Sequence, residues 1–216
     1  MDQRLRTLER GEDEGLEVQA ALLRARLRAG VLDEERLQLA ALLGDPAARA
    51  VAPHVSWPSR SYDLARQLAN LGWQTLARVA LAWARAHWGE DLRELDPSLH
   101  ALEAVLRAGA PDRGVRETVN QHHERWVQRH LDEGGWIGHQ SMIRYADTAL
   151  ALRAAAFAAS GGSILRQRGG LRGAVSSQEA ATVMFSSAIA TSAVDDVLDG
   201  TRAEVLPWAL GLAEPR

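Results

Sequence analysis

The sequence predicts an all-α fold of about ten helices, packed as an irregular bundle or a short α-solenoid with a single core. Ala and Leu dominate the 216-residue chain, whereas Phe and Tyr occur only twice each. No Val- or Ile-rich alternating run is present from which strands could form. Hydrophobic residues at 46% and charged residues at 25% are typical of a globular protein with a sizeable core.

The helices are predicted from apolar periodicity and from residues that begin or end them. In chain order they cover residues 2–10, 14–29, 33–43, 46–51, 61–70, 73–88, 97–109, 113–133, 137–160, 177–198 and 202–212. Asp33 is placed to cap the third of these helices, and Gly44 is placed to end it. Asp45-Pro46 then puts a capping carboxylate before a proline at the first helical position.

Three more start signals lie farther along the chain. Asp96-Pro97 repeats the pattern of a carboxylate before a helix-opening proline. Ser176 with Glu179, and Thr201 with Glu204, have the spacing of a capping box. These signals predict helices that begin near residues 97, 177 and 202.

Two longer breaks interrupt the helices. The segment Val51–Ser61 carries two prolines, and the segment Gly161–Gly173 carries five glycines and three arginines and is predicted to be a surface loop or lid. The first break separates a charged N-terminal helical segment, residues 1–51, from a main helical body, residues 61–212. We expect the two to form one continuous domain.

The composition excludes several kinds of chemistry. Cys is absent, which excludes disulfides, thiolate metal sites and a cysteine nucleophile. Lys is absent as well, which excludes Schiff-base chemistry and a P-loop lysine. A net charge of -3 gives no long-range attraction to nucleic acid or to an anionic membrane. With no secretory signal and no apolar run of roughly 20 residues, we expect a cytoplasmic protein.

A cluster of histidines is the first candidate site. His122 lies on the apolar stripe of one predicted helix, His123 and His130 share another face of it, and Asp147 interrupts the stripe of the next helix. Imidazoles facing a carboxylate suit a His–Asp acid–base pair or a metal site. The alternative is a set of hydrogen bonds that only stabilises helix packing. The absence of HExxH or HxH spacing favours this alternative.

Asp195, Asp196 and Asp199 form a DDxxD pattern, which is the second candidate site. The pattern resembles the motif of all-helical isoprenoid synthases, in which clustered carboxylates bind magnesium ions that hold a diphosphate. A second, NSE-like metal motif is missing. We therefore favour a solvated C-terminal end of helix 177–198, where three carboxylates oppose the helix macrodipole.

The irregular segments supply the remaining candidates. Arg166, Arg168 and Arg172, among glycines, could clamp a phosphate or a carboxylate of a partner, or could belong to a flexible linker. Trp57, beside a proline in the first long break, is either an interface anchor or a plug beneath its own loop. For nucleophilic catalysis there is no GxSxG motif, and the serines are not expected to pair with a histidine.

The middle of the chain resembles a family of Ala-, Leu- and Trp-rich helical immunity proteins of bacterial polymorphic-toxin systems. The segments that carry this resemblance are GWQTLARVALAWARAHW, from Gly72 to Trp88, and LDPSLHALEAVLRAG, from Leu95 to Gly109. Asp96-Pro97 matches the opening of the family's second helix. The resemblance implies a helical protein that neutralises a toxin. It assigns no site residues to this chain.

These observations together predict a non-enzymatic protein-binding module, of the immunity or antitoxin type, that neutralises or scaffolds another protein. No cofactor, membrane or nucleic acid is expected. The alternative is a small all-α metal protein or enzyme that uses the histidine cluster or the DDxxD residues. The predicted contact residues share a place in the two irregular segments. They are Trp57, Arg60, Arg166, Arg168 and Arg172.

Overall fold

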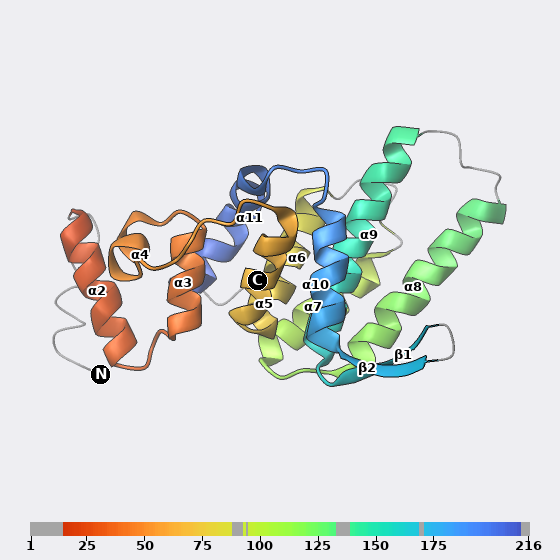
Figure 1. The fold of residues 1–216 in the computed structure, drawn as a ribbon, viewed down its shortest axis with the longest axis horizontal. Coiled ribbons are helices and arrows are strands. Elements are labelled where there is room, and N and C mark those ends of the chain that lie inside the picture. Colours follow the sequence, from red (N-terminus) through yellow and green to blue (C-terminus); the bar gives the residue numbers. More distant parts are fainter. Residues whose placement is uncertain (1–14, 88–92, 94, 133–138, 169–170, 213–216) are drawn as a thin grey trace. The chain divides into compact units, whose positions relative to one another are not determined.

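The structure is a computed structural model that describes residues 15–87, 93, 95–132, 139–168 and 171–212. For residues 129–132, 139–146, 163–168 and 171–174 it describes the backbone alone. Ten helices and one short hairpin make up the described part of the chain, which confirms the all-α prediction (Figure 1). The chain divides into two compact units, one formed by the residues up to Pro58 and those from Arg202 onward, the other by Ser59–Thr201.

In its described residues, the first unit contains three complete helices and the end of a fourth. They are α2 (Leu16–Arg28), α3 (Glu34–Leu42), α4 (Pro46–Val51) and the last residues of α11 (Val194–Ala209). Both α2 and α3 pack against the short α4.

The predicted boundaries of helices 14–29, 33–43 and 46–51 are confirmed to within two residues, and the predicted helix 2–10 lies outside the described residues. The Asp33 carboxylate accepts a hydrogen bond of 2.7 Å from the backbone N–H of Arg36, and the Asp45 carboxylate accepts one of 2.7 Å from that of Ala48. Each cap satisfies an N–H that has no partner within its own helix. Gly44 follows α3 with φ +86°, a left-handed conformation that suits glycine.

Arginine side chains cap the C-terminal end of α11. Arg26 donates a 3.2 Å hydrogen bond to the carbonyl of Leu210, and Arg36 donates to the carbonyl of Trp208. The Arg36 guanidinium also lies over the Trp208 ring, 4.9 Å from its centroid. Positive groups at this end complement the helix macrodipole and satisfy the last carbonyls.

The second unit holds the remaining elements. They are α5 (Ser61–Asn70), α6 (Trp73–Ala86), α7 (Asp96–Ala108), α8 (Arg113–Asp132), α9 (His139–Ser160), β1 (Ser163–Arg168), β2 (Leu171–Ser176), α10 (Ser177–Ala188) and the first residues of α11.

Helix α9 is the centre of this unit. It packs against α6, α7, α8 and α10, and Figure 1 shows α10 alongside it. Every side chain from Ala154 to Ser160 is buried, and so is every one from Thr75 to Ala84 on α6. A helical stretch that is buried on all sides belongs in a core, and small Ala side chains let the neighbouring backbones approach closely.

The prediction of a surface loop or lid over Gly161–Gly173 is wrong for the backbone that the structure describes. Strands β1 and β2 pair in antiparallel register from Ser163 with Ser176 to Arg168 with Leu171. At the open end of the hairpin, the hydroxyl of Ser177, which follows β2, donates a 2.7 Å hydrogen bond to the carbonyl of Gly161, which precedes β1. The hairpin is therefore anchored to the first turn of α10.

The predicted boundary between the last two helices is also wrong. The chain leaves the helix after Ala188 and starts α11 at Val194, not at residue 202. Thr201 caps nothing, because its buried hydroxyl donates a 2.9 Å hydrogen bond to the carbonyl of Val197 within α11. The Ser176 cap is confirmed, because Ser176 accepts a 3.0 Å hydrogen bond from the N–H of Glu179.

Among the residues that the structure describes, no helix combines the length and apolar character needed to cross a membrane.

Candidate functional site

His122 lies at the interface of α8 with α7. Its Nδ1 is 2.8 Å from the hydroxyl oxygen of Ser98, a residue of α7 that is fully buried. Burial lowers the pKa of His122 below its ordinary value, and the nearby positive charge of Arg125 lowers that pKa further. The imidazole is therefore neutral at neutral pH and serves as a hydrogen-bonding partner between two helices.

Ser98 was not predicted as a partner of a histidine, and that expectation is wrong at this position. The two residues are 24 positions apart in the chain and lie on different helices, so their spacing carries no sequence signal. The hydroxyl has an exposed fraction of 0%. A nucleophile must reach its substrate, so this geometry favours packing over catalysis.

His123 interacts with a different neighbour. Burial lowers the pKa of His123, the positive charge of Arg153 on α9 lowers it further, and Glu124 opposes the shift. The Arg153 side chain also donates a 3.2 Å hydrogen bond to the side-chain oxygen of Asn120 on α8. His122 therefore contacts α7, whereas the pKa of His123 is lowered by an arginine of α9.

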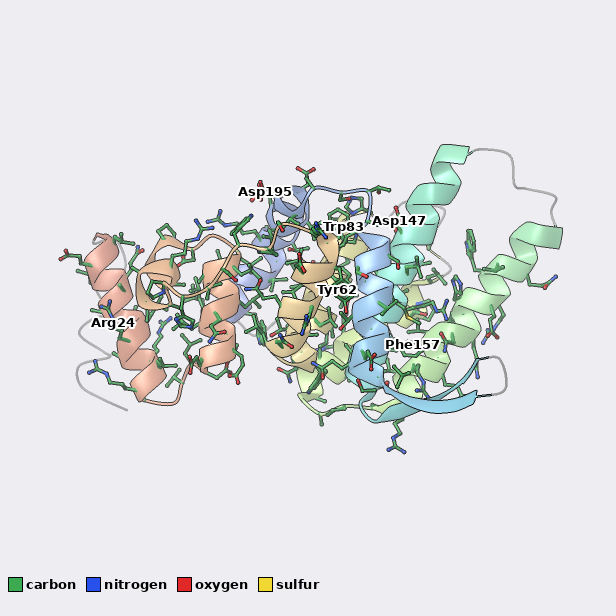
Figure 2. All side chains as sticks on the ribbon, viewed as in Figure 1. Arg24, Tyr62, Trp83, Asp147, Phe157 and Asp195 are labelled. Carbon is green, nitrogen blue, oxygen red and sulfur yellow. The ribbon has the colours of Figure 1, made fainter. Side chains whose placement is uncertain are left out.

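Asp147 lies on α9 toward the end where Trp83 of α6 is found, and Phe157 lies toward the opposite end of α9 (Figure 2). Burial raises the pKa of Asp147, and the positive charge of His87 acts in the opposite direction. His87 extends α6, with its Nδ1 2.9 Å from the carbonyl of Trp83 and its ring centroid 3.9 Å from that of the indole. The group that opposes the raised pKa of Asp147 is therefore His87.

His87 was not among the predicted site residues. In the sequence, His87 follows Trp83 by four residues on the predicted helix 73–88, so both share one helix face. That spacing, together with Asp147 on an apolar stripe, is a signal that points to His87. The His130 side chain lies outside the described residues. Within the side chains that the structure describes, no group of three or more His, Asp or Glu residues could hold a metal ion.

The DDxxD residues lie at the start of a helix, which corrects the expected C-terminal end. Asp195 and Asp196 occupy the first turn of α11, and both are exposed, as is Asp199. Carboxylates in a first turn are stabilised by the positive end of the macrodipole. The local electrostatics that the sequence predicted as unfavourable are therefore favourable.

The residues predicted to contact a partner are placed as follows. Trp57 follows α4 in the first unit with an exposed fraction of 47%, and the Arg49 guanidinium lies 5.0 Å from its ring centroid. Arg60 is exposed and precedes α5 in the second unit.

The three arginines of the Gly/Arg segment lie on the hairpin strands. The hairpin register pairs Arg166 with Gly173, Arg168 with Leu171 and Arg172 with Gln167.

No protein-family model matches the chain, and no curated protein and no solved structure matches it either.

Proposed function

We propose that this chain is a binding module for another protein, of the immunity type that neutralises or scaffolds its partner. The observation that carries the proposal is the position of Trp57. An indole with an exposed fraction of 47% stands on the irregular segment after α4, held from one side by Arg49. Trp and Arg are the residue types that contribute most at protein–protein interfaces.

A second Arg–Trp pair in the same unit gives a useful contrast. The Trp208 ring has an exposed fraction of only 8%, and its partner Arg36 donates to the carbonyl of Trp208. That pair stabilises the end of α11. The Arg49–Trp57 pair has the same chemistry, but Trp57 has an exposed fraction of 47%, which supports a role in contact with another molecule.

The resemblance of Gly72–Trp88 and Leu95–Gly109 to immunity proteins supports a toxin as the partner. The net charge of -3 argues against a polyanion such as nucleic acid. Arginine as the sole basic residue type supports bidentate pairing with carboxylates of a protein.

The test measures binding of the purified chain to proteins encoded by neighbouring genes. Trp57→Ala should weaken the complex by at least about 30-fold, the effect of losing about 2 kcal/mol at an interface hot spot. Tyr62→Ala is the matched control, because Tyr62 is an aromatic residue of the other unit with an exposed fraction of 53%. Absence of any bound neighbour, or equal losses in the two variants, would contradict the proposal.

A further inference from the structure

Two guanidinium groups converge beside Gly44, the residue that follows α3. A Cβ added to Gly44 would lie 3.5 Å from Nη1 of Arg202 and 3.7 Å from Nη2 of Arg49. Both groups therefore border the same small volume. We call Arg49 and Arg202 the Gly44 arginine pair.

Both side chains are fixed by carbonyls at the C-terminal end of α3. Arg49 donates a 3.1 Å hydrogen bond through Nε to the carbonyl of Ala41, and Arg202 donates a 3.5 Å hydrogen bond through Nη2 to the carbonyl of Gly44. Arg49 makes this bond through Nε, which holds the guanidinium in place. The bond does not use the terminal nitrogen Nη2 that lies near Gly44. Preorganised donors of this kind lose little entropy when a ligand binds.

The pair lacks a negative partner among the residues that the structure describes, since no ion pair involves Arg49 or Arg202. Asp45, which follows Gly44 in the chain, uses its carboxylate to cap α4. Two like charges held this close repel each other. An anion that contacts both would relieve this repulsion.

An apolar surface adjoins the two charges. The Trp57 ring lies against Arg49 and has an exposed fraction of 47%. The site thus offers two guanidinium groups for one anionic group and an indole face for whatever is attached to it. A planar guanidinium fork matches a carboxylate, and the indole face matches an apolar side chain next to it.

We propose that the Gly44 arginine pair binds a carboxylate of the partner protein, an Asp or Glu side chain whose apolar neighbour in that protein lies on Trp57. This inference rests on the proposed function and adds the chemical class of the recognised segment, an acidic peptide. A single-stranded nucleic acid would offer phosphate and a stacking base instead. The net charge of -3 disfavours such a polyanion.

The test follows the indole N–H signal of Trp57 in ¹H–¹⁵N spectra of the full chain, identified by its loss in Trp57→Phe. The probes are two blocked dipeptides, N-acetyl-Phe-Glu-amide and N-acetyl-Phe-Gln-amide, and a hexathymidylate. The Glu peptide should give a saturable shift with an affinity at least about tenfold higher than the Gln peptide, because a charge-assisted pair is lost in the latter. Equal affinities, or tighter binding of the oligonucleotide, would overturn the inference.

The variants locate the site. Arg49→Gln and Arg202→Gln should each weaken the Glu peptide at least about fivefold, whereas Arg66→Gln, at an exposed arginine of the other unit, should leave it unchanged. Arg49→Lys and Arg202→Lys keep the charge and should give intermediate losses. If a Gln variant fails to fold, the Lys variants still test whether the guanidinium groups recognise the peptide. Full retention of affinity for the Glu peptide in both Lys variants would contradict guanidinium recognition.

The outcomes separate this inference from the proposed function. A protein partner that depends on Trp57 but binds both Gln variants normally would overturn the arginine site and leave the binding role intact. A response to the Glu peptide that depends on the arginine pair, without any protein partner, would support the site and contradict the proposed function.

Discussion

Replacing Ser98 by Ala tests the link between α7 and α8. The change removes a 2.8 Å hydrogen bond from a fully buried hydroxyl and leaves Nδ1 of the half-buried His122 without that bond. Loss of the bond and incomplete solvation of the imidazole should cost about 1–2 kcal/mol. The higher helix propensity of Ala returns about 0.4 kcal/mol. The net loss of about 1 kcal/mol should lower the Tm of a chain of this size by about 2–4 °C.

Urea unfolding at pH 7.5 measures this loss, and a double-mutant cycle with His122→Ala isolates the pair. We expect a coupling free energy of about 1 kcal/mol. Ser187→Ala is the control, because its exposed hydroxyl donates only within α10, and its effect should stay within about 0.5 kcal/mol. The reasoning is refuted if the coupling is zero and Ser98→Ala is as mild as the control.

Three further predictions concern pH and backbone conformation. The folded pKa values of His122 and His123 lie below the ordinary 6.5, so the unfolded chain binds more protons in acid. Their contribution to stability should be complete above pH 6.5 and decline as the pH falls below it, as urea titrations from pH 8 to 5 will show. Asp147→Asn should raise the free energy of unfolding at pH 7, because burial raises the pKa of this carboxyl and penalises its charge. A loss in that variant would show that the attraction between Asp147 and His87 outweighs the cost of burial. Gly44→Ala should cost about 1–2 kcal/mol in thermal melts because φ is +86°, whereas Gly15→Ala, in open space at negative φ, should be tolerated.

Helix starts were predictable where the signal is local. Asp33, Asp45 and Ser176 each accept a hydrogen bond from the N–H three residues later, so a few consecutive residues contain the whole interaction. The capping-box spacing of Thr201 and Glu204 failed because the same spacing also occurs inside a helix. There the Thr201 hydroxyl bonds to the preceding turn.

The break between α10 and α11 was not predictable from the signals used. Residues 189–193 read Ile-Ala-Thr-Ser-Ala and contain neither Gly nor Pro, so no helix-ending signal interrupts the predicted helix there. The misplaced boundary had a chemical consequence. It moved the Asp195–Asp199 carboxylates from the start of one helix to the end of another and reversed the sign of their interaction with the macrodipole.

The hairpin did leave a signal in the sequence. In the sequence, the dipeptide Gly169-Gly170 stands between the residues of the two strands, and Gly-Gly is a typical sequence signal of a hairpin. The signal was outweighed because the flanking residues carry three arginines and little β-branched character. A two-stranded ribbon needs support from its surroundings, and here the Ser177 contact with Gly161 supplies part of it.

The site pairings illustrate a different limit. Helical spacing correctly placed His122 on a face that buries Val115, Val119 and Trp126. Spacing on one helix cannot say which neighbour that face meets. Ser98 for His122 and His87 for Asp147 follow from how α7 and α6 pack, which is tertiary information.

The use of arginine as the only basic residue connects the fold to the proposed site. Arg26, Arg36 and Arg78 each donate to a carbonyl near the end of a helix, at Leu210, Trp208 and Leu106 respectively. A guanidinium carries several N–H donors in a fixed plane, so it can satisfy such a carbonyl and still present other donors elsewhere. An ammonium group lacks this fixed division of donors. The Gly44 arginine pair extends the same device from a helix end to the surface, where the remaining donors face a ligand.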